Sequence, residues 1–282
     1  MREINEFIDY LLWEKNMSQN TADSYRRDLS QFFTEVGKGV TEVTSEDISR
    51  FIRQLRAEGC KVSTANRKLS CLKSFYKYLT RKGVVPYSPA EAVDGGKREK
   101  RLPKPIERGD IEKIFKACRS LKEKAVVEIL YATGVRREEL VKLKKSDVNY
   151  ERGFIRVVGK GNKERIIPIH DAAIQIIKEL AAMSDSEWLF PSEKKEGEHI
   201  TPRQVNNIVE TIAKRAGLTG ITPHRFRHSF CSHLYDGGAN PKAIKDMAGH
   251  GSYNTTDLYT EISVERNMNE YRQAHPRSLM TV

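Results

Sequence analysis

Several features that define other classes of protein are missing from this sequence of 282 residues. No apolar run approaches the roughly 20 residues that a membrane-spanning helix requires, and no charged-then-apolar signal segment is found near residue 1. The four cysteines are scattered and form no C-x-x-C pair: Cys60, Cys71, Cys118 and Cys231. These absences predict a cytoplasmic protein with reduced, mostly structural thiols.

Signatures of several common kinds of chemistry are also missing. There is no H-E-x-x-H, no G-x-S-x-G and no G-x-G-x-x-G. The stretch from Gly153 to Gly161 is a poor match to a phosphate-binding loop, because its glycine spacing is wrong and a glycine stands where Ser or Thr should follow Lys160. Chemistry driven by nucleotide hydrolysis is therefore not expected, and no metal or other cofactor is predicted.

Acidic residues are absent between Gly59 and Ala90, although seven basic residues occur there. A solvated helix face usually mixes both signs, because opposite charges four residues apart stabilise it. The whole chain has a net charge of +11, which favours a polyanionic partner. The charge distribution therefore indicates a surface for nucleic acid in the first ninety residues.

The first ninety residues predict four helices, near 4–15, 20–37, 44–59 and 63–83. Asn20 or Thr21 is the predicted N-cap of the second helix and Gly37 its end, and Ser45 is the predicted cap of the third. In the fourth, an apolar face is predicted to face the core and a basic face the exterior. The apolar face contains Leu69, Leu72, Tyr76 and Leu79, and the opposite side contains Asn66, Ser70, Lys73, Lys77 and Arg81.

The length and the helical spacing of apolar residues predict a mainly α protein of two domains. Residues 94–105 (DGGKREKRLPKP) are typical of an exposed basic linker, which either lies along phosphates or is a solvated tether. This assigns 1–93 to a small helical domain and 106–282 to a larger one, which is also mainly helical. Alternation of β-branched residues around GKGNK predicts a β-hairpin over 153–169, and SEWLF (186–190) indicates a further short strand.

The stretch TPHRFRHSF, residues 222–230, predicts a helix that begins at the N-cap Thr222 and ends near Asp236. The residues of this helix are compatible with two kinds of binding site. In the first, His224, His228 and Cys231 share one face and bind a metal, although Arg227 among them would repel a cation. In the second, His224 and Arg227 bind a phosphate at the positive end of the helix. The second fits the residue types better, because a guanidinium binds a phosphate with two parallel hydrogen bonds.

Three other stretches contain residues that could complete a phosphate site. In YATGVRREEL, Gly134 is the predicted end of one helix and Arg136 the beginning of the next, although local ion pairs with the glutamates that follow would also explain the arginines. In VVGKGNKER, Lys160 is at the predicted hairpin tip, where an ordinary turn lysine is the alternative. The third stretch, AGHGSYNTTDLYTEI, contains His250 and, nine residues later, Tyr259, with Asn254 as a plausible N-cap.

In order and spacing, these motifs resemble those of the tyrosine recombinase (phage integrase) family: R of ATGVR, K of GKG, HxxR of PHRFRH, and GH with Tyr nine residues later. The resemblance covers nearly the whole chain. The helical first domain is similar to that family's core-binding domain, and the basic linker falls where its two-domain DNA clamp is joined. The compact layout resembles the Xer-type resolvases of chromosome and plasmid dimers, including their archaeal members.

The resemblance implies a metal- and ATP-independent enzyme that cuts and rejoins DNA. Six catalytic residues would surround a DNA phosphate, with the tyrosine as nucleophile: Arg136, Lys160, His224, Arg227, His250 and Tyr259. It also implies double-stranded DNA with a dif-like site as partner, and a tetramer of this chain on two duplexes. The basic residues expected at the DNA are Arg67, Lys68, Lys73, Lys77, Arg81, Lys100 and Arg101. An integrase of a mobile element and a non-catalytic DNA-binding protein are the alternatives.

Two departures from the family pattern are visible. Arg137 follows the first catalytic arginine, where the family usually has an apolar or small residue, and Glu261 stands where many Xer-type members have His. The segment 261–282 is mostly polar but contains Ile262, Met268 and Tyr271. It resembles the family's C-terminal segment that packs against a neighbouring protomer, and this packing is the expectation here.

Overall fold

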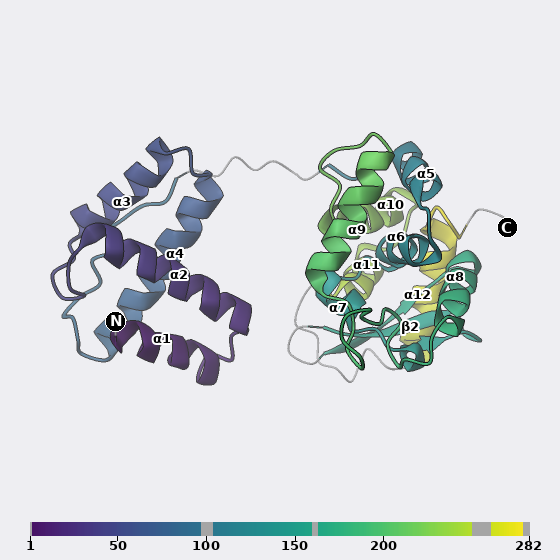
Figure 1. The fold of residues 1–282 in the computed structure, drawn as a ribbon, viewed down its shortest axis with the longest axis horizontal. Coiled ribbons are helices and arrows are strands. Elements are labelled where there is room, and N and C mark those ends of the chain that lie inside the picture. The colour runs from purple at the N-terminus through teal and green to yellow at the C-terminus, as the bar shows by residue number, and fades with distance from the viewer. Residues whose placement is uncertain (1, 97–103, 160–162, 250–260, 279–282) are drawn as a thin grey trace. The chain divides into compact units, whose positions relative to one another are not determined.

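The computed structural model of the chain describes residues 2–96, 104–159, 163–249 and 261–278 (Figure 1). The chain divides into two compact units, 1–101 and 102–282. Both are mainly helical in their described parts, which confirms the predicted fold class. The finer boundaries at residues 93 and 105 stay a prediction. None of the helices described is long and apolar enough to cross a membrane.

Unit 1 contains the four predicted helices: α1 (Arg2–Trp13), α2 (Gln19–Val36), α3 (Ser45–Ala57) and α4 (Val62–Arg81). Two N-caps differ from the prediction. Ser18 caps α2 by accepting a hydrogen bond from the Thr21 backbone N–H, and Thr44 caps α3 in a capping box with Asp47. The cap is the residue whose side-chain oxygen reaches the free N–H groups, so a neighbouring Ser or Thr is easily mistaken for it. Gly37 ends α2 in the left-handed region, as predicted (φ 66°).

The core of unit 1 is rich in aromatic rings. Phe7 of α1 packs edge-on against Phe75 of α4, with ring centroids 5.3 Å apart. The predicted apolar face of α4 is buried throughout, from Leu69 to Leu79. This packing fixes α4 in the unit and leaves Lys77 and Arg81 exposed to solvent.

Unit 2 combines one small sheet with a larger set of helices. Its helices are α5 (Arg108–Ala117), α6 (Leu121–Thr133), α7 (Arg137–Val141), the 3₁₀ helix η1 (Lys145–Asp147), α8 (Asp171–Ala182), α9 (Pro202–Arg215), α10 (Pro223–Asp236), α11 (Pro241–Ala248) and α12 (Glu261–Ala274). The strands are β1 (Val148–Asn149), β2 (Phe154–Val158) and β3 (Glu164–Pro168), antiparallel in the order β1-β2-β3.

The predicted hairpin over 153–169 is confirmed, with Ile155 opposite Ile167. The expected strand at 186–190 is wrong. In that segment only a single bridge joins Lys144 and Trp188. The strand β1 was not predicted, because two residues are too few to show an alternating pattern.

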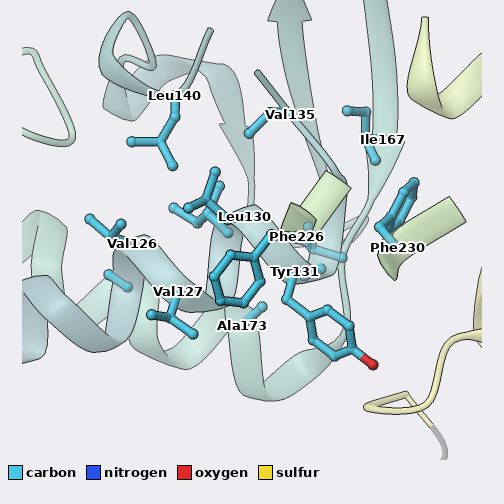
Figure 2. Close-up of a cluster of buried hydrophobic side chains, with 14 of the residues drawn as sticks. Val126, Val127, Leu130, Tyr131, Val135, Leu140, Ile167, Ala173, Phe226 and Phe230 are labelled. Carbon is cyan, nitrogen blue, oxygen red and sulfur yellow. The ribbon is translucent and has the colours of Figure 1, made fainter. Parts of the chain in front are cut away.

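The helix α6 is the centre of unit 2. Every residue from Ala125 to Thr133 is buried, and α8, α9 and α10 all pack against it. Figure 2 shows Leu130 and Tyr131 of this helix in one cluster with Phe226 and Phe230 of α10. A helix enclosed on all sides holds its C-terminal end in a fixed position, and that end leads directly into the predicted phosphate site.

The C-terminal half of α12 and the residues after it pack on their own unit. Tyr271 and His275 are fully buried, and Arg277 donates hydrogen bonds of 2.8 and 2.7 Å to the Glu128 carboxylate of α6. The side chain of Tyr271 therefore belongs to the core of its own unit. That the segment 261–282 packs against a neighbouring protomer stays a prediction. The side chain of Ile262 lies outside the described residues.

Candidate active site

The turn after α6 places the first predicted catalytic residue. Gly134 ends α6 with φ 59°, and a Cβ at this position would lie 2.5 Å from Cδ1 of Phe230. Both facts require glycine here. The chain then reaches Arg136, which is the N-cap of α7, so the predicted helix end and helix beginning are confirmed.

The helix α10 places the second arginine. Thr222 caps it by accepting a hydrogen bond from the Arg225 backbone N–H, Pro223 occupies the first turn and the helix ends at Asp236, as predicted. Arg227 is only 4% exposed, and its guanidinium donates to the carbonyl oxygens of Gly134, at 2.7 Å, and Ala248. It thereby joins the C-terminal ends of α6 and α11.

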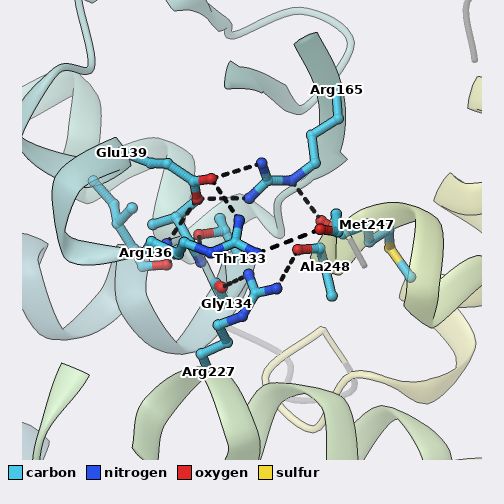
Figure 3. Close-up of polar contacts among 11 residues, drawn as sticks. Thr133, Gly134, Arg136, Glu139, Arg165, Arg227, Met247 and Ala248 are labelled. Carbon is cyan, nitrogen blue, oxygen red and sulfur yellow. Dashed lines mark hydrogen bonds and ion pairs between the residues drawn. The ribbon is translucent and has the colours of Figure 1, made fainter. Parts of the chain in front are cut away.

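A buried carboxylate joins two further guanidiniums to this cluster (Figure 3). Glu139 accepts from Arg136 Nη1 at 2.8 Å, and from Arg165 Nη1 and Nη2 at 3.0 and 2.7 Å. The local ion pair that was the alternative explanation for Arg136 is thus formed. Arg137 likewise pairs with Glu138 at 2.8 Å, on the exposed side of α7.

The cluster has more positive than negative charge. Burial acts to raise the pKa of Glu139, but its hydrogen bonds and ion pairs with Arg165 and Arg136 outweigh burial and lower it. Burial, and then the charges of Arg136 and Arg165, lower the pKa of Arg227 to about 10. The single carboxylate of Glu139 balances only one of the three guanidinium charges. An anion bound here would relieve the remaining repulsion.

A cavity of about 680 Å³ opens beside this cluster. Arg136, His224 and Arg227 line it together with the first turn of α10, where backbone N–H groups favour an anion. His224 is exposed to this cavity, one helical turn before Arg227. Three of the predicted catalytic residues are therefore brought together at one opening.

The other three predicted catalytic residues, Lys160, His250 and Tyr259, lie outside the described residues, as does Asn254. The residues directly before two of them are described. Gly159 follows β2, and Gly249 ends α11 in the left-handed region (φ 70°). The Gly249 carbonyl oxygen accepts from Arg136 Nη2 at 3.4 Å, so the end of α11 lies at the arginine cluster.

The three residues of the alternative metal site line two different pockets. His228 and Cys231 line a separate pocket of about 410 Å³ between α10 and α11, whereas His224 lines the larger cavity. Among the residues that the structure describes, no three His, Cys, Asp or Glu side chains are arranged to hold a metal ion.

The predicted DNA contacts of α4 differ in their surroundings. Lys68 is only 8% exposed, and its ammonium donates hydrogen bonds to Asp28 at 2.9 Å and to Gln31 at 2.6 Å. The buried Asp28 requires this charge, and Arg67 pairs with the same carboxylate. The predicted DNA contacts of α4 all stay predictions: Arg67, Lys68, Lys73, Lys77 and Arg81. Lys100 and Arg101 lie outside the described residues.

Sequence reasoning missed Glu139 and Arg165. A signal existed for each. Arg165 occupies a position of β3 whose neighbours on the same face, such as Ile167, are buried, and a charge there must be paired. Glu139 follows Arg136 by three residues, which is the capping-box spacing at a helix N-terminus.

Comparisons with known proteins agree with this geometry. Residues 104–266 match the "Phage integrase family" model, and residues 4–83 match "Phage integrase, N-terminal SAM-like domain". The chain is 33% identical to "Tyrosine recombinase XerD" of Listeria monocytogenes serotype 4b, over 98% of this chain and 99% of that protein. It is 35% identical to "Tyrosine recombinase XerC" of Pelobacter propionicus, over 99% of this chain and 96% of that protein.

A solved structure shares the fold. A lambda integrase dimer bound to a COC′ core site superposes with a TM-score of 0.73 at 18% identity, covering 92% of this chain and 97% of that one. The family model of the larger unit alone spans more than half of the chain, and the relatives match over nearly its whole length. The chain therefore belongs to the phage integrase family of tyrosine recombinases.

Proposed function

We propose that this chain is a site-specific DNA recombinase that cuts and rejoins DNA through a 3′-phosphotyrosyl intermediate. The observation that carries the proposal is the arginine cluster. Arg136, Arg165 and Arg227 surround the single carboxylate of Glu139, beside the cavity that His224 lines. A site with surplus guanidiniums and a histidine at a helix N-terminus suits a phosphodiester that becomes more negative in its transition state.

Each of the six residues has a proposed role. A tyrosine hydroxyl with a pKa of about 10 is only ~0.1% ionised at neutral pH, so Tyr259 needs a base when it attacks the scissile phosphate. His224 accepts its proton, and Arg136 and Arg227 neutralise the two non-bridging oxygens. His250 donates a further hydrogen bond, and Lys160 gives a proton to the departing 5′-oxygen.

The proposed intermediate makes the reaction reversible. A bond forms between the Tyr259 oxygen and phosphorus as the bond to the 5′-oxygen breaks, so one phosphoester replaces another. The link keeps the free energy of the phosphodiester. A 5′-hydroxyl from a partner duplex can then attack it, restore DNA and release the tyrosine, and the proposal requires neither metal nor ATP.

Relatives support the partners in this proposal. One lambda integrase structure is of a tetramer bound to a Holliday junction, which supports four copies of this chain on two duplexes. The relatives at 33% and 35% identity are XerD and XerC, whereas a transposon integrase matches at 18%. We therefore favour Xer-type resolution of chromosome or plasmid dimers, at a dif-like site in the cytoplasm, over integration of a mobile element.

A covalent-trapping experiment tests the proposal. A nicked substrate, whose 5′-hydroxyl fragment diffuses away after cleavage, should leave a covalent protein–DNA adduct with the wild-type chain. Tyr259→Phe should form none, because it lacks the attacking oxygen. Tyr235→Phe, which changes an exposed tyrosine of α10, is the matched control and should form adduct at the wild-type rate. An adduct that persists in Tyr259→Phe, or none in the wild type on any cognate DNA, would refute the proposal.

A further inference from the structure

We infer that Arg165 is a positioning residue that holds the ends of three catalytic segments in register. The inference rests on the proposed function, but Arg165 is not one of the six residues assigned to the chemistry. It lies in β3 and is only 5% exposed. A buried guanidinium is costly to desolvate, so the partners it has acquired show what the charge is for.

The first segment is the beginning of α7. Arg165 forms a two-pronged ion pair with Glu139, at 3.0 and 2.7 Å. The same Glu139 oxygen that accepts from Arg165 Nη1 accepts from Arg136 Nη1 at 2.8 Å, and the other accepts from the Arg136 backbone N–H at 2.7 Å. Glu139 is thus fixed by Arg165 and in turn fixes Arg136 (Figure 3). Arg165 orients a phosphate ligand that it does not itself need to touch.

The second segment is the end of α11. Arg165 Nε donates to the Met247 carbonyl oxygen at 2.9 Å, and Gly249 lies against the same side chain. A Cβ on Gly249 would be 3.2 Å from Cδ, Nε and Cζ of Arg165, tighter than an ordinary contact. Gly249 immediately precedes His250 in the sequence. The guanidinium therefore sets where the chain leaves α11 toward the histidine.

The third segment is the hairpin. A Cβ on Gly159 would lie 3.2 Å from Arg165 Nη1 and 3.4 Å from Glu139 Oε1. Gly159 immediately precedes Lys160. The glycines before the lysine and before the histidine thus both pack on the Arg165 side chain, and neither could be replaced without displacing it.

The variant Arg165→Lys separates two effects of Arg165: its positive charge and the geometry of its hydrogen bonds. A lysine ammonium keeps the positive charge near Glu139, so no buried carboxylate is left without a counter-charge. Its three donors share one nitrogen at the end of a flexible stem, however, so it cannot bond both Glu139 oxygens and the Met247 carbonyl in the geometry of the planar fork. Arg165→Lys should therefore fold but hold Arg136 and the two glycines loosely.

The test compares Arg165→Lys with Arg156→Lys, a matched control. Arg156 is an exposed residue of β2 that pairs with Asp147 at 3.2 Å. We measure the melting temperature, the affinity for target DNA and the single-turnover rate of adduct formation. Adduct formation by Arg165→Lys should be slower by about 100-fold, because small displacements of catalytic groups have effects of that size. DNA affinity and melting temperature should match the control.

A second substrate tests whether Arg165 acts by positioning Arg136. A methylphosphonate at the scissile position removes one anionic oxygen, so the placement of its arginine partner matters less. The rate ratio of wild type to Arg165→Lys should shrink on this substrate. A ratio that stays the same would overturn the inference. So would an Arg165→Lys rate within about threefold of the control, or a lysine variant that fails to fold, since the role would then be structural.

The inference and the proposed function fail in different ways. If the wild-type chain forms no Tyr259 adduct, the proposed function is refuted before Arg165 is tested. If the wild type forms the adduct and Arg165→Lys forms it equally fast, only the positioning role is refuted.

Discussion

Two buried glutamates of unit 2, Glu128 and Glu139, differ in how their charge is balanced. Glu128 is fully buried and pairs with Arg277. His170 Nε2 also lies 3.0 Å from the Glu128 carboxylate. Glu139 is 6% exposed and has two arginines bonded to it and a third charged close by. Glu128 has one permanent countercharge, whereas Glu139 has a surplus.

The comparison separates a structural pair from a binding site. The Glu128 pair is closed over by stacked rings, with His275 parallel to Tyr271 at a centroid distance of 4.7 Å. Nothing about its charge requires a further ligand. The Glu139 cluster borders a cavity and has charge to spare, so it gains free energy when an anion binds. Changes around Glu128 should therefore affect stability, and changes around Glu139 should affect chemistry.

The largest expected effect is on stability, from Arg277→Met. Removal of this partner leaves the Glu128 charge buried and uncompensated, which should lower the free energy of unfolding by about 3–5 kcal/mol. Urea denaturation followed by circular dichroism measures it. Arg272→Met, at an exposed position of α12, is the matched control. Adding Glu128→Gln should restore much of the loss, and equal stability of Arg277→Met and the control would show that Glu128 does not depend on this pair.

The next effect is on chemistry, from Arg227→Met. Loss of one donor to the transition state should slow adduct formation by about 10²–10³-fold, or about 2.7–4 kcal/mol. The free energy of unfolding should change much less than in Arg277→Met, because burial, and then the charges of Arg136 and Arg165, already disfavour the charge of Arg227. Arg225→Met, two positions earlier in α10, is the control. If Arg227→Met lost stability and cleaved DNA at the control rate, the Glu139 cluster would be a structural pair like that of Glu128, which would contradict the comparison.

The smallest expected effect is a pH dependence of the free energy of unfolding, caused by His275 beside the Glu128 pair. Burial, and then the neighbouring His170, lower the pKa of His275 well below 6.5. Below pH 6.5 the unfolded chain therefore binds a proton that the folded chain does not, so stability falls as pH decreases, by up to about 1.4 kcal/mol per pH unit. His275→Asn should flatten this slope, and His199→Asn, in a loop, should not. Thermal melts between about pH 5 and 8 measure it, and an unchanged slope in His275→Asn would contradict it.

Local signals in the sequence predicted the elements that position the site. Thr222 with Pro223 marked the beginning of α10, and Gly134 marked the end of α6, because capping and positive φ depend on adjacent residues. The spacing of Leu69 to Leu79 likewise predicted the buried face of α4. The resemblance to the recombinase family supplied the six catalytic positions, which spacing alone could not have assigned.

Pairings between distant residues could not be predicted. Lys68 was expected at DNA because its neighbours in the sequence are basic, but its partner Asp28 is 40 residues away. Arg165 and Glu139 are 26 residues apart, and Arg165 contacts Met247 across 82 residues. Which charge meets which carboxylate depends on the packing of α7, β3 and α11, and periodicity within one element contains no information about that packing.

The pair between Glu128 and Arg277 also bears on the order in which the chain becomes competent during its synthesis. The two residues are 149 positions apart, and Glu128 belongs to the central helix of unit 2. Unit 1 has all four of its helices within residues 1–101 and can fold while translation continues. The core around α6 remains open until residues 271–277 emerge from the ribosome. A nascent chain therefore completes its first, basic unit before its arginine cluster is fully supported, and the ability to break DNA is acquired last.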